Sequence, residues 1–189
     1  MVFSSLTFLC IFLPIVVILY GIFPVKWRNF LLLAASLVFY AWGEPRYILI
    51  MLFSTVFDYI NGRLIEYYDK QQKQKAKKRV VMVSIVGNLG ILAFFKYTDM
   101  LIVSWNQITA SNLSLLKIAL PIGISFFTFQ ILSYLIDVYK GKVKAQKNFL
   151  KYLLYISFFP SVVQGPIPRY ADLGTQLYEE HRFEYDNLR

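Results

Sequence analysis

Three polar side chains lie at helical spacing within an apolar segment, and they are the first candidates for chemistry in this sequence. Gln130, Ser133 and Asp137 are three and four residues apart, which places them on one face of a helix. Polar groups at membrane depth are tolerated only beside protein or water, so this face could form a polar wall of a substrate tunnel. Hydrogen bonding between helices, with Asp137 paired to a nearby lysine, is the alternative and remains open.

A break rich in proline and glycine follows, from Gly165 and Pro166 to Arg169, directly after Gln164. Its two prolines remove backbone donors and its glycine permits a sharp bend, so the freed backbone groups must face protein or a cavity. An arginine at such a break could hold a phosphate or a carboxylate. The alternative is a turn at the membrane interface, with Arg169 reaching toward the headgroups.

The other candidates are weaker. Asp58, Asn61 and Arg63 are expected at the cytoplasmic end of a helix, where such groups usually serve solvation and orientation, and a functional role is the alternative. His181 is the only histidine, but it lies among charged residues that would not desolvate it, so we do not expect it to act as a general base. One histidine and one cysteine, Cys10, exclude a multi-histidine metal site or a disulfide built from this chain alone, so we expect no metal.

The elements that must position these groups are membrane helices, because the composition is that of an integral membrane protein. The chain is 57% hydrophobic and 16% charged, and its mean hydropathy is +0.50. A soluble domain is about half apolar and about a quarter charged. The net charge of +9 comes from basic residues in short loops between apolar segments, which orients membrane helices and does not indicate nucleic-acid binding.

The sequence predicts an all-α polytopic bundle of about six membrane helices, some of them short or broken. Gly87, Asn88 and Gly90 would let the fourth helix pack closely. The basic segments 26–28, 63–79 and 140–148 are predicted to be cytoplasmic, which places the N-terminus outside. Residues 99–114 are interpreted as an external loop or a surface-lying helix, and 171–189 as an amphipathic interfacial segment. The expected helices cover about 6–23, 30–42, 47–60, 80–95, 115–139 and 148–163.

Four blocks of sequence carry a resemblance to a known family. They are FYAWGEPRY at 39–47, FFKY at 94–97, LPIGISFFTFQILSYLIDVYKGKVKAQKNF at 120–149 and SFFPSVVQGPIPRY at 157–170. In this order and spacing they resemble the N-terminal part of the membrane-bound O-acyltransferase family, in its branch that O-acetylates alginate and other polysaccharides. The resemblance implies that residues 1–170 are the N-terminal transmembrane part of such an enzyme and that the chain is a portion of a longer protein.

The resemblance also implies an activity. A protein of this family in the bacterial cytoplasmic membrane would take an acyl group from acetyl-CoA or a carrier thioester. It would pass the group across the bilayer to a hydroxyl of an extracytoplasmic polysaccharide, with a periplasmic protein as a further partner. The family's catalytic histidine is expected downstream, so no catalytic residue is assigned here. Candidates that would line or shape the tunnel are Ser125, Phe129, Gln130, Ser133, Asp137, Gln164, Gly165, Pro166 and Arg169. The rival function is a non-catalytic transporter or scaffold of a polysaccharide machine.

Overall fold

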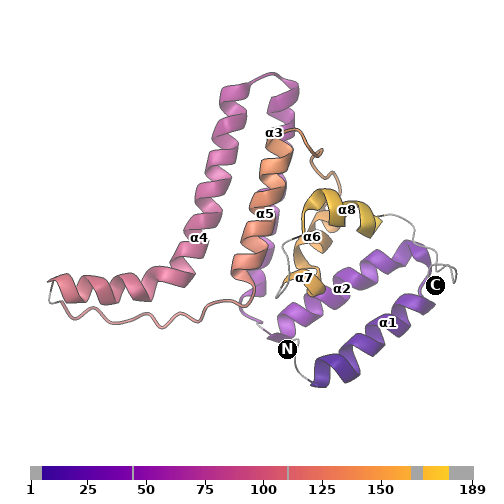
Figure 1. The fold of residues 1–189 in the computed structure, drawn as a ribbon, viewed down its shortest axis with the longest axis horizontal. Helices are drawn as coiled ribbons and strands as arrows, with labels where there is room; N and C mark the ends of the chain where they lie inside the picture. The colour runs from indigo at the N-terminus through magenta and orange to yellow at the C-terminus, as the bar shows by residue number, and fades with distance from the viewer. Residues whose placement is uncertain (1–5, 44, 110, 163–167, 179–189) are drawn as a thin grey trace.

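The computed structural model describes residues 6–43, 45–109, 111–162 and 168–178, and in these ranges every regular element is a helix (Figure 1). The all-α prediction is therefore confirmed. The elements are a π-helical turn η1 (Phe8–Phe12), α1 (Leu13–Ile22), α2 (Val25–Gly43), α3 (Ile48–Lys70), α4 (Gln74–Thr109), α5 (Ile124–Tyr139), α6 (Phe149–Ser157), α7 (Phe159–Val162) and α8 (Tyr170–Tyr178).

The first helix has an irregular turn because of its proline. Pro14 has no backbone N–H to donate, and just before it Leu13 N–H bonds to the carbonyl of Phe8, five residues back. The wider turn η1 results. The next helix, α2, begins at Val25 and includes the basic residues that we interpreted as a turn before position 30.

The largest difference from the prediction is the region 63–79, which we expected to be a loop. The structure continues α3 to Lys70 and starts α4 at Gln74, so most of this region forms the tip of a helical hairpin. Ion pairs at helical spacing hold the added turns, with Glu66 contacting Arg63 at 3.4 Å and Lys70 at 2.8 Å. Lys77 pairs with Asp69 across the tip. The sequence pattern missed these turns because their charges suggested a loop.

Beyond its contact with α3, α4 turns away from the bundle and forms an arm (Figure 1). The arm covers residues 99–109 of the region 99–114, so this part is a helix, and its position at a membrane surface stays a prediction. The chain then returns along the arm, because Asn106 exchanges hydrogen bonds of 2.9 and 3.0 Å with the backbone of Leu113. Since this return is extended, α5 begins at Ile124 and not near 115.

Gly123 sets the start of α5. It has a φ of +77°, a left-handed conformation that favours glycine, and a Cβ there would collide with the carbonyl oxygen of Val162 in α7. The first turn of α5 therefore packs directly on the end of α7. From this start α5 becomes the central helix, with nine of its sixteen residues buried.

The expected sixth span is two short helices. Asn148 caps α6 by accepting hydrogen bonds from Leu150 N and Lys151 N at 2.9 and 3.3 Å, and α6 ends at Ser157. Phe158 leaves the helical conformation, and the short helix α7 begins at Phe159 and includes Pro160. A break inside the expected helix 148–163 agrees with the short or broken helices that the sequence predicted.

The outer surface of the bundle is apolar and its centre holds polar groups. Leu6, Leu49, Phe53 and Val86 are all more than 60% exposed, whereas Asp58, Gln130 and Asn88 are at most 2% exposed. Two helices, α3 and α4, are long and apolar enough to cross a membrane, and Phe8–Ile22 and Ile124–Tyr139 are shorter apolar segments. Within the described ranges, the structure thus supports a membrane protein but does not confirm six membrane helices.

Candidate functional site

A buried pair of polar side chains joins α3 to α4. Asp58 is completely buried, and its Oδ2 accepts a hydrogen bond of 2.8 Å from Nδ2 of Asn88, which also donates to Ser84 O at 2.9 Å. We expected Asp58 and Asn61 at a solvated helix end, and this was wrong, because α3 runs on to Lys70. Only Arg63 of that group is exposed.

Small residues let α3 pack closely on both α4 and α5. A Cβ on Gly87 would lie 3.3 Å from the Phe57 ring, and one on Gly62 would lie 3.2 Å from the Tyr134 ring. Gly87 and Asn88 therefore play the packing role that the sequence predicted for them, whereas Gly90 faces open space.

Some buried polar atoms near Asp58 make no hydrogen bond. Among the described residues, Asp58 Oδ1, Asn61 Nδ2 and the Tyr152 hydroxyl are buried without a hydrogen-bond partner. Buried polar groups of this kind usually bond to water or to a ligand, because leaving them unpaired costs about 1–3 kcal/mol each. Asp58 and Asn61 belong to α3 and Tyr152 to α6, so unpaired hydrogen-bonding groups of two helices lie in the described interior.

Gln130, a candidate for a tunnel wall, bonds to a neighbouring helix. Its Nε2 donates to the carbonyl oxygen of Tyr155 in α6 at 2.8 Å. That carbonyl is free because Phe159 N, its normal helical partner, donates to Ser36 Oγ in α2 at 3.2 Å. For Gln130 the structure supports the inter-helix alternative.

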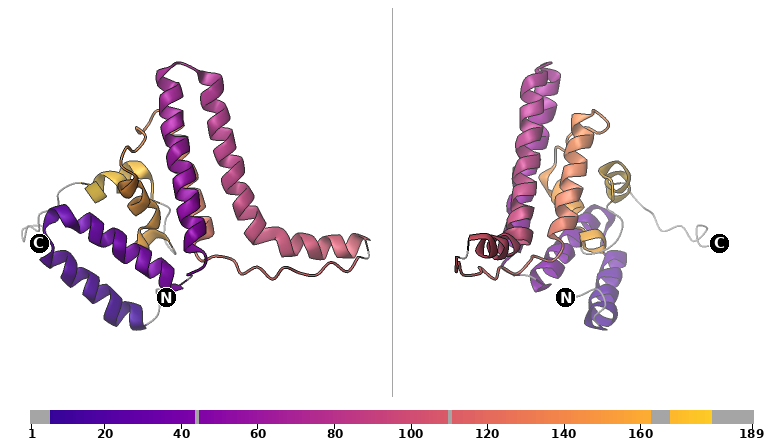
Figure 2. Two further views of the ribbon diagram at one scale, coloured as in Figure 1. Left: turned by 180° about the vertical axis from the view of Figure 1, so that it is seen from behind. Right: turned by 60° about the vertical axis from the view of Figure 1, so that its left-hand side comes forward.

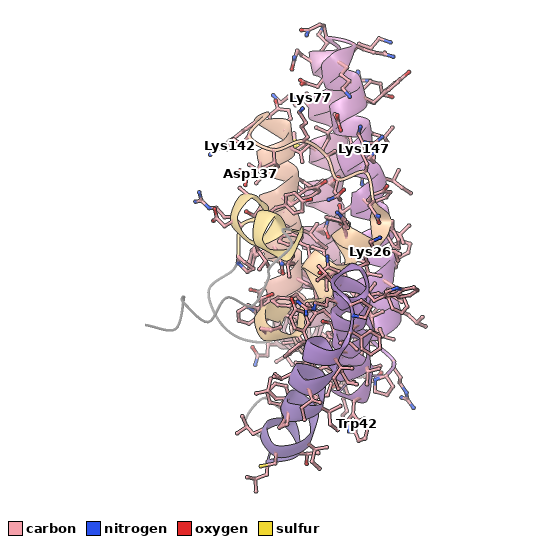
Figure 3. The ribbon with its side chains drawn as sticks, turned by 90° about the vertical axis from the view of Figure 1, so that its right-hand side faces the viewer. Lys26, Trp42, Lys77, Asp137, Lys142 and Lys147 are labelled. Carbon is pink, nitrogen blue, oxygen red and sulfur yellow. The ribbon has the colours of Figure 1, made fainter. Side chains whose placement is uncertain are left out.

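The other polar residues of that face are only partly buried. Ser133 and Asp137 follow Gln130 along α5, and Asp137 lies at the same end of the bundle as Lys142 (Figure 3). No salt bridge joins Asp137 to a lysine in the described part of the chain, so the predicted pairing is not observed. The backbone carbonyl of Asp137 instead accepts from Lys142 N at 2.9 Å and closes the turn after α5.

Some of the remaining candidates lie among the described residues, and the others lie outside them. Ser125 is partly buried in the first turn of α5, and Phe129 is 46% exposed on its outer face. Arg169 is exposed directly before α8, where its carbonyl accepts from Asp172 N and Leu173 N at 3.1 and 3.0 Å. Gln164, Gly165, Pro166 and His181 lie outside the described residues.

A cluster of tyrosines, which the sequence analysis missed, connects these elements. Ring centroids are 4.9 Å apart for Tyr134 and Tyr152, 4.8 Å for Tyr134 and Tyr170, and 5.0 Å for Tyr155 and Tyr170. The Tyr155 hydroxyl donates to Pro168 O at 3.0 Å, so α6 holds the end of the Pro/Gly-rich segment beside Arg169. The spacing of Tyr152 and Tyr155 was visible in the sequence, but their partners lie in other helices.

Gln146 is the centre of the polar contacts around this cluster. Its backbone N–H donates to the Tyr134 hydroxyl at 2.9 Å, its Nε2 donates to the Tyr170 hydroxyl at 2.7 Å, and its Oε1 accepts from Asn148 N at 3.0 Å. Burial raises the pKa of Tyr170, and the hydrogen bond from Gln146 opposes this shift. A neutral tyrosine and an amide can position groups, but neither is a strong base at neutral pH.

Three of the four lysines labelled in Figure 3 lie toward one end of the bundle, and Lys26 lies near its middle. Lys77, Lys142 and Lys147 lie together there, and Trp42 lies at the opposite end (Figure 3). Lys77 is 6% exposed and its ammonium group lies 4.9 Å from the centroid of the Tyr139 ring, which joins the hairpin tip to the end of α5. The separation of basic residues from Trp42 is the arrangement expected of helices in a bilayer.

Comparison with known proteins identifies relatives of this chain. It is 39% identical over 181 residues to a probable alginate O-acetylase (AlgI) of Pseudomonas aeruginosa, covering 94% of this chain and 34% of the relative. The corresponding protein of Azotobacter vinelandii is 38% identical, with 94% and 36% covered. A peptidoglycan O-acetyltransferase of Helicobacter pylori is 31% identical over an alignment of 219 positions, with 100% and 41% covered.

The matches cover most of this chain but only part of each relative. The chain spans about a third of the length of the alginate O-acetylases that it matches. A teichoic acid D-alanyltransferase of Lacticaseibacillus rhamnosus is 25% identical over 84% of the chain. No protein-family model matches the sequence. No solved structure matches it either.

Proposed function

The 189 residues belong by sequence to the membrane-bound O-acyltransferase family, and on that premise we propose that they are the helical scaffold of an enzyme that O-acetylates an extracytoplasmic polysaccharide. The observation that carries the proposal is similarity to alginate O-acetylases over 94% of the chain. Alginate is the acceptor we favour, and peptidoglycan is the acceptor named in the more distant relative.

The chemistry needs groups that the described residues do not include. Transfer of an acyl group to a hydroxyl requires a general base and stabilisation of an oxyanion. The single histidine, His181, lies outside the described residues, so the described part of the chain holds no histidine. As the family resemblance implies, we assign the base to a histidine further along the complete protein, and we assign to this chain the shaping of the site.

Arg169 is the residue of this chain that we place nearest the reaction path. It follows the Pro/Gly-rich segment, and Tyr155 fixes the backbone beside it through Pro168. Its guanidinium group is suited to the phosphates of acetyl-CoA or of a phosphopantetheine thioester. Either donor would supply the acetyl group from the cytoplasm, and a periplasmic partner would receive or deliver it on the other side.

The proposed topology has six membrane segments. They are α1 with η1, α2, α3, the first part of α4, α5, and α6 together with α7, with the N-terminus outside and the regions 63–79 and 140–148 in the cytoplasm. The last segment enters from the cytoplasmic side without leaving the chain on the other side, because Tyr170 after it bonds to Gln146 of the cytoplasmic region. The position of Lys77, Lys142 and Lys147 at one end and Trp42 at the other supports it (Figure 3).

The test is complementation. The complete gene is expressed in an alginate-producing bacterium that lacks its own O-acetylase, and acetyl esters on the secreted alginate and on peptidoglycan are measured by NMR. We expect acetyl esters to return to alginate. If the protein reaches the membrane in normal amount and no polysaccharide carries acetyl esters, the enzyme proposal fails and the scaffold function replaces it.

Arg169→Ala tests the role of the arginine within the same assay. A charge-assisted hydrogen bond contributes about 1.5–3 kcal/mol, so we expect acetylation to fall at least about tenfold at an unchanged protein level. Arg79→Ala removes an exposed arginine from the hairpin tip and serves as the matched control. Equal acetylation by both variants would remove Arg169 from the reaction path.

A further inference from the structure

The outer face of α3 carries a continuous apolar stripe. Its residues recur every three or four positions, so they lie on one side of the helix and are 36–69% exposed; they are Leu49, Phe53, Val56, Ile60, Leu64 and Tyr67. At 1.5 Å per residue the stripe is ~27 Å long, close to the ~30 Å of a bilayer's hydrocarbon core. In the view from behind, α3 lies in front of α5 and nearest the reader (Figure 2, left). This face is therefore suited to lipid.

A groove lies at the end of this stripe that is nearer the hairpin tip. It is a shallow, open depression of about 390 Å³ between side chains of α3 alone, and it is lined by Tyr59, Ile60, Arg63, Leu64 and Tyr67. Two aliphatic side chains and two aromatic rings make its walls apolar, and the guanidinium group of Arg63 gives it one charged edge. The groove thus combines an apolar wall with a cation at the depth where the apolar stripe ends.

The charge at this edge is positive in excess. Glu66 contacts Arg63 at 3.4 Å and Lys70 at 2.8 Å, and Lys147 also acts on it electrostatically. Three cations around one carboxylate leave two positive charges in excess. The hydroxyl of Tyr59, which lines the groove, donates to the carbonyl oxygen of Lys147 at 2.6 Å and so holds Lys147 beside it.

We propose that this groove binds one anionic phospholipid, with its phosphate between Arg63 and Lys147 and an acyl chain along Ile60 and Leu64. The excess positive charge selects a headgroup with a net negative charge over a zwitterionic one. The apolar walls select a lipid over a soluble anion, because only a lipid also covers Ile60 and Leu64. The lipid would lie between α3 and the turn after α5, at the cytoplasmic end of the proposed topology.

The proposal is tested by native mass spectrometry of the complete protein with added phosphatidylglycerol or phosphatidylcholine. We expect the first phosphatidylglycerol to bind more tightly than phosphatidylcholine. A cation at a membrane surface contributes about 1 kcal/mol, so the double variant Arg63→Gln/Lys147→Gln should bind phosphatidylglycerol about 30-fold more weakly. The control Lys96→Gln/Lys117→Gln removes the same charge from exposed positions outside the groove and should leave binding unchanged.

A second variant separates the lipid chain from the headgroup. Ile60→Trp fills the groove at a position that is 51% exposed and changes no charge, so it should also weaken binding, by about tenfold or more. Equal affinities for the two lipids in the unmodified protein overturn the proposal, as they would if other parts of the complete protein cover the groove. Weakening in the double variant without weakening in Ile60→Trp would show an anion site that does not hold the lipid chain, and would also overturn it.

Discussion

Replacing Asn88 with leucine tests whether the buried polar pair stabilises the contact between α3 and α4. Leucine has the same number and branching of side-chain heavy atoms as asparagine, so Asn88→Leu removes the amide without opening a cavity. The substitution leaves Asp58, which is completely buried, without the 2.8 Å hydrogen bond that it accepts from Asn88. The second bond of Asn88 goes to Ser84 O within its own helix, and its loss leaves that carbonyl in the helical ladder.

Two estimates bound the expected cost. An unpaired buried polar group costs about 1–3 kcal/mol, whereas hydrogen bonds between membrane helices average about 0.6 kcal/mol with a maximum near about 1.7. Asp58 is fully buried and already has one oxygen without a partner among the described residues, which places the cost at the upper part of the membrane range. We expect Asn88→Leu to lower the free energy of unfolding by about 1.5 kcal/mol.

The double variant gives the decisive comparison. In Asp58→Leu/Asn88→Leu no polar group of the pair remains buried, and replacing both partners of a hydrogen bond by apolar groups is often nearly neutral. We expect it to lie within about 0.5 kcal/mol of the unmodified protein and to be more stable than Asn88→Leu alone.

The assay is unfolding of the complete protein in mixed micelles, titrated with sodium dodecyl sulfate and followed by circular dichroism. Gln107→Leu, an exposed glutamine on the arm of α4, is the matched control and should change the free energy of unfolding little. If the double variant is less stable than Asn88→Leu, the pair does not act as an isolated buried hydrogen bond, and the reasoning above is refuted.

Three further predictions concern other parts of the structure. Gly123→Ala should destabilise the protein by more than Gly141→Ala. Both glycines have positive φ, so a Cβ costs about 1–2 kcal/mol at each position, but only at Gly123 does it also meet a carbonyl oxygen. Equal losses of stability in the same unfolding assay would contradict this prediction. Gln146→Ala removes two side-chain hydrogen bonds and should lower the free energy of unfolding by about 1–3 kcal/mol. It should also speed proteolysis of the segment before α8, and an unchanged rate of proteolysis would count against the prediction. In a background without the native cysteine, Lys75→Cys should be labelled by an impermeant maleimide only in inverted vesicles and Asn112→Cys only in intact cells, and the reverse pattern would invert the topology.

The sequence was sufficient for the class of the fold and insufficient for the lengths of the helices. Composition and the grouping of basic residues predicted an all-α membrane protein, and the structure agrees with the helical class. The predicted helix ends were wrong where charged residues lie within a helix. The residues around Glu66 suggested a solvated loop, yet their charges are spaced to pair along a helix and extend α3 to Lys70.

The candidate site shows a different kind of limit. Helical periodicity placed Gln130, Ser133 and Asp137 on one face, but periodicity does not show what that face contacts. Gln130 bonds to Tyr155 O because Phe159 N has turned to Ser36, a residue 123 positions earlier in the chain. No local pattern contains that information, because the partner is selected by the packing of α2 on α7.

The polar interior described here serves mainly to join helices, and this changes where the reaction path is to be sought. Gln130 and Asn88 are committed to hydrogen bonds between helices, and Tyr134 and Tyr170 are committed to Gln146. Arg169 differs from them, because its side chain is exposed while the backbone beside it is fixed by Tyr155. An accessible side chain beside fixed backbone is the kind that can bind a substrate, since contacts elsewhere already hold that backbone in position. Arg169 is therefore a stronger candidate for substrate binding than the polar face of α5 that carries Gln130.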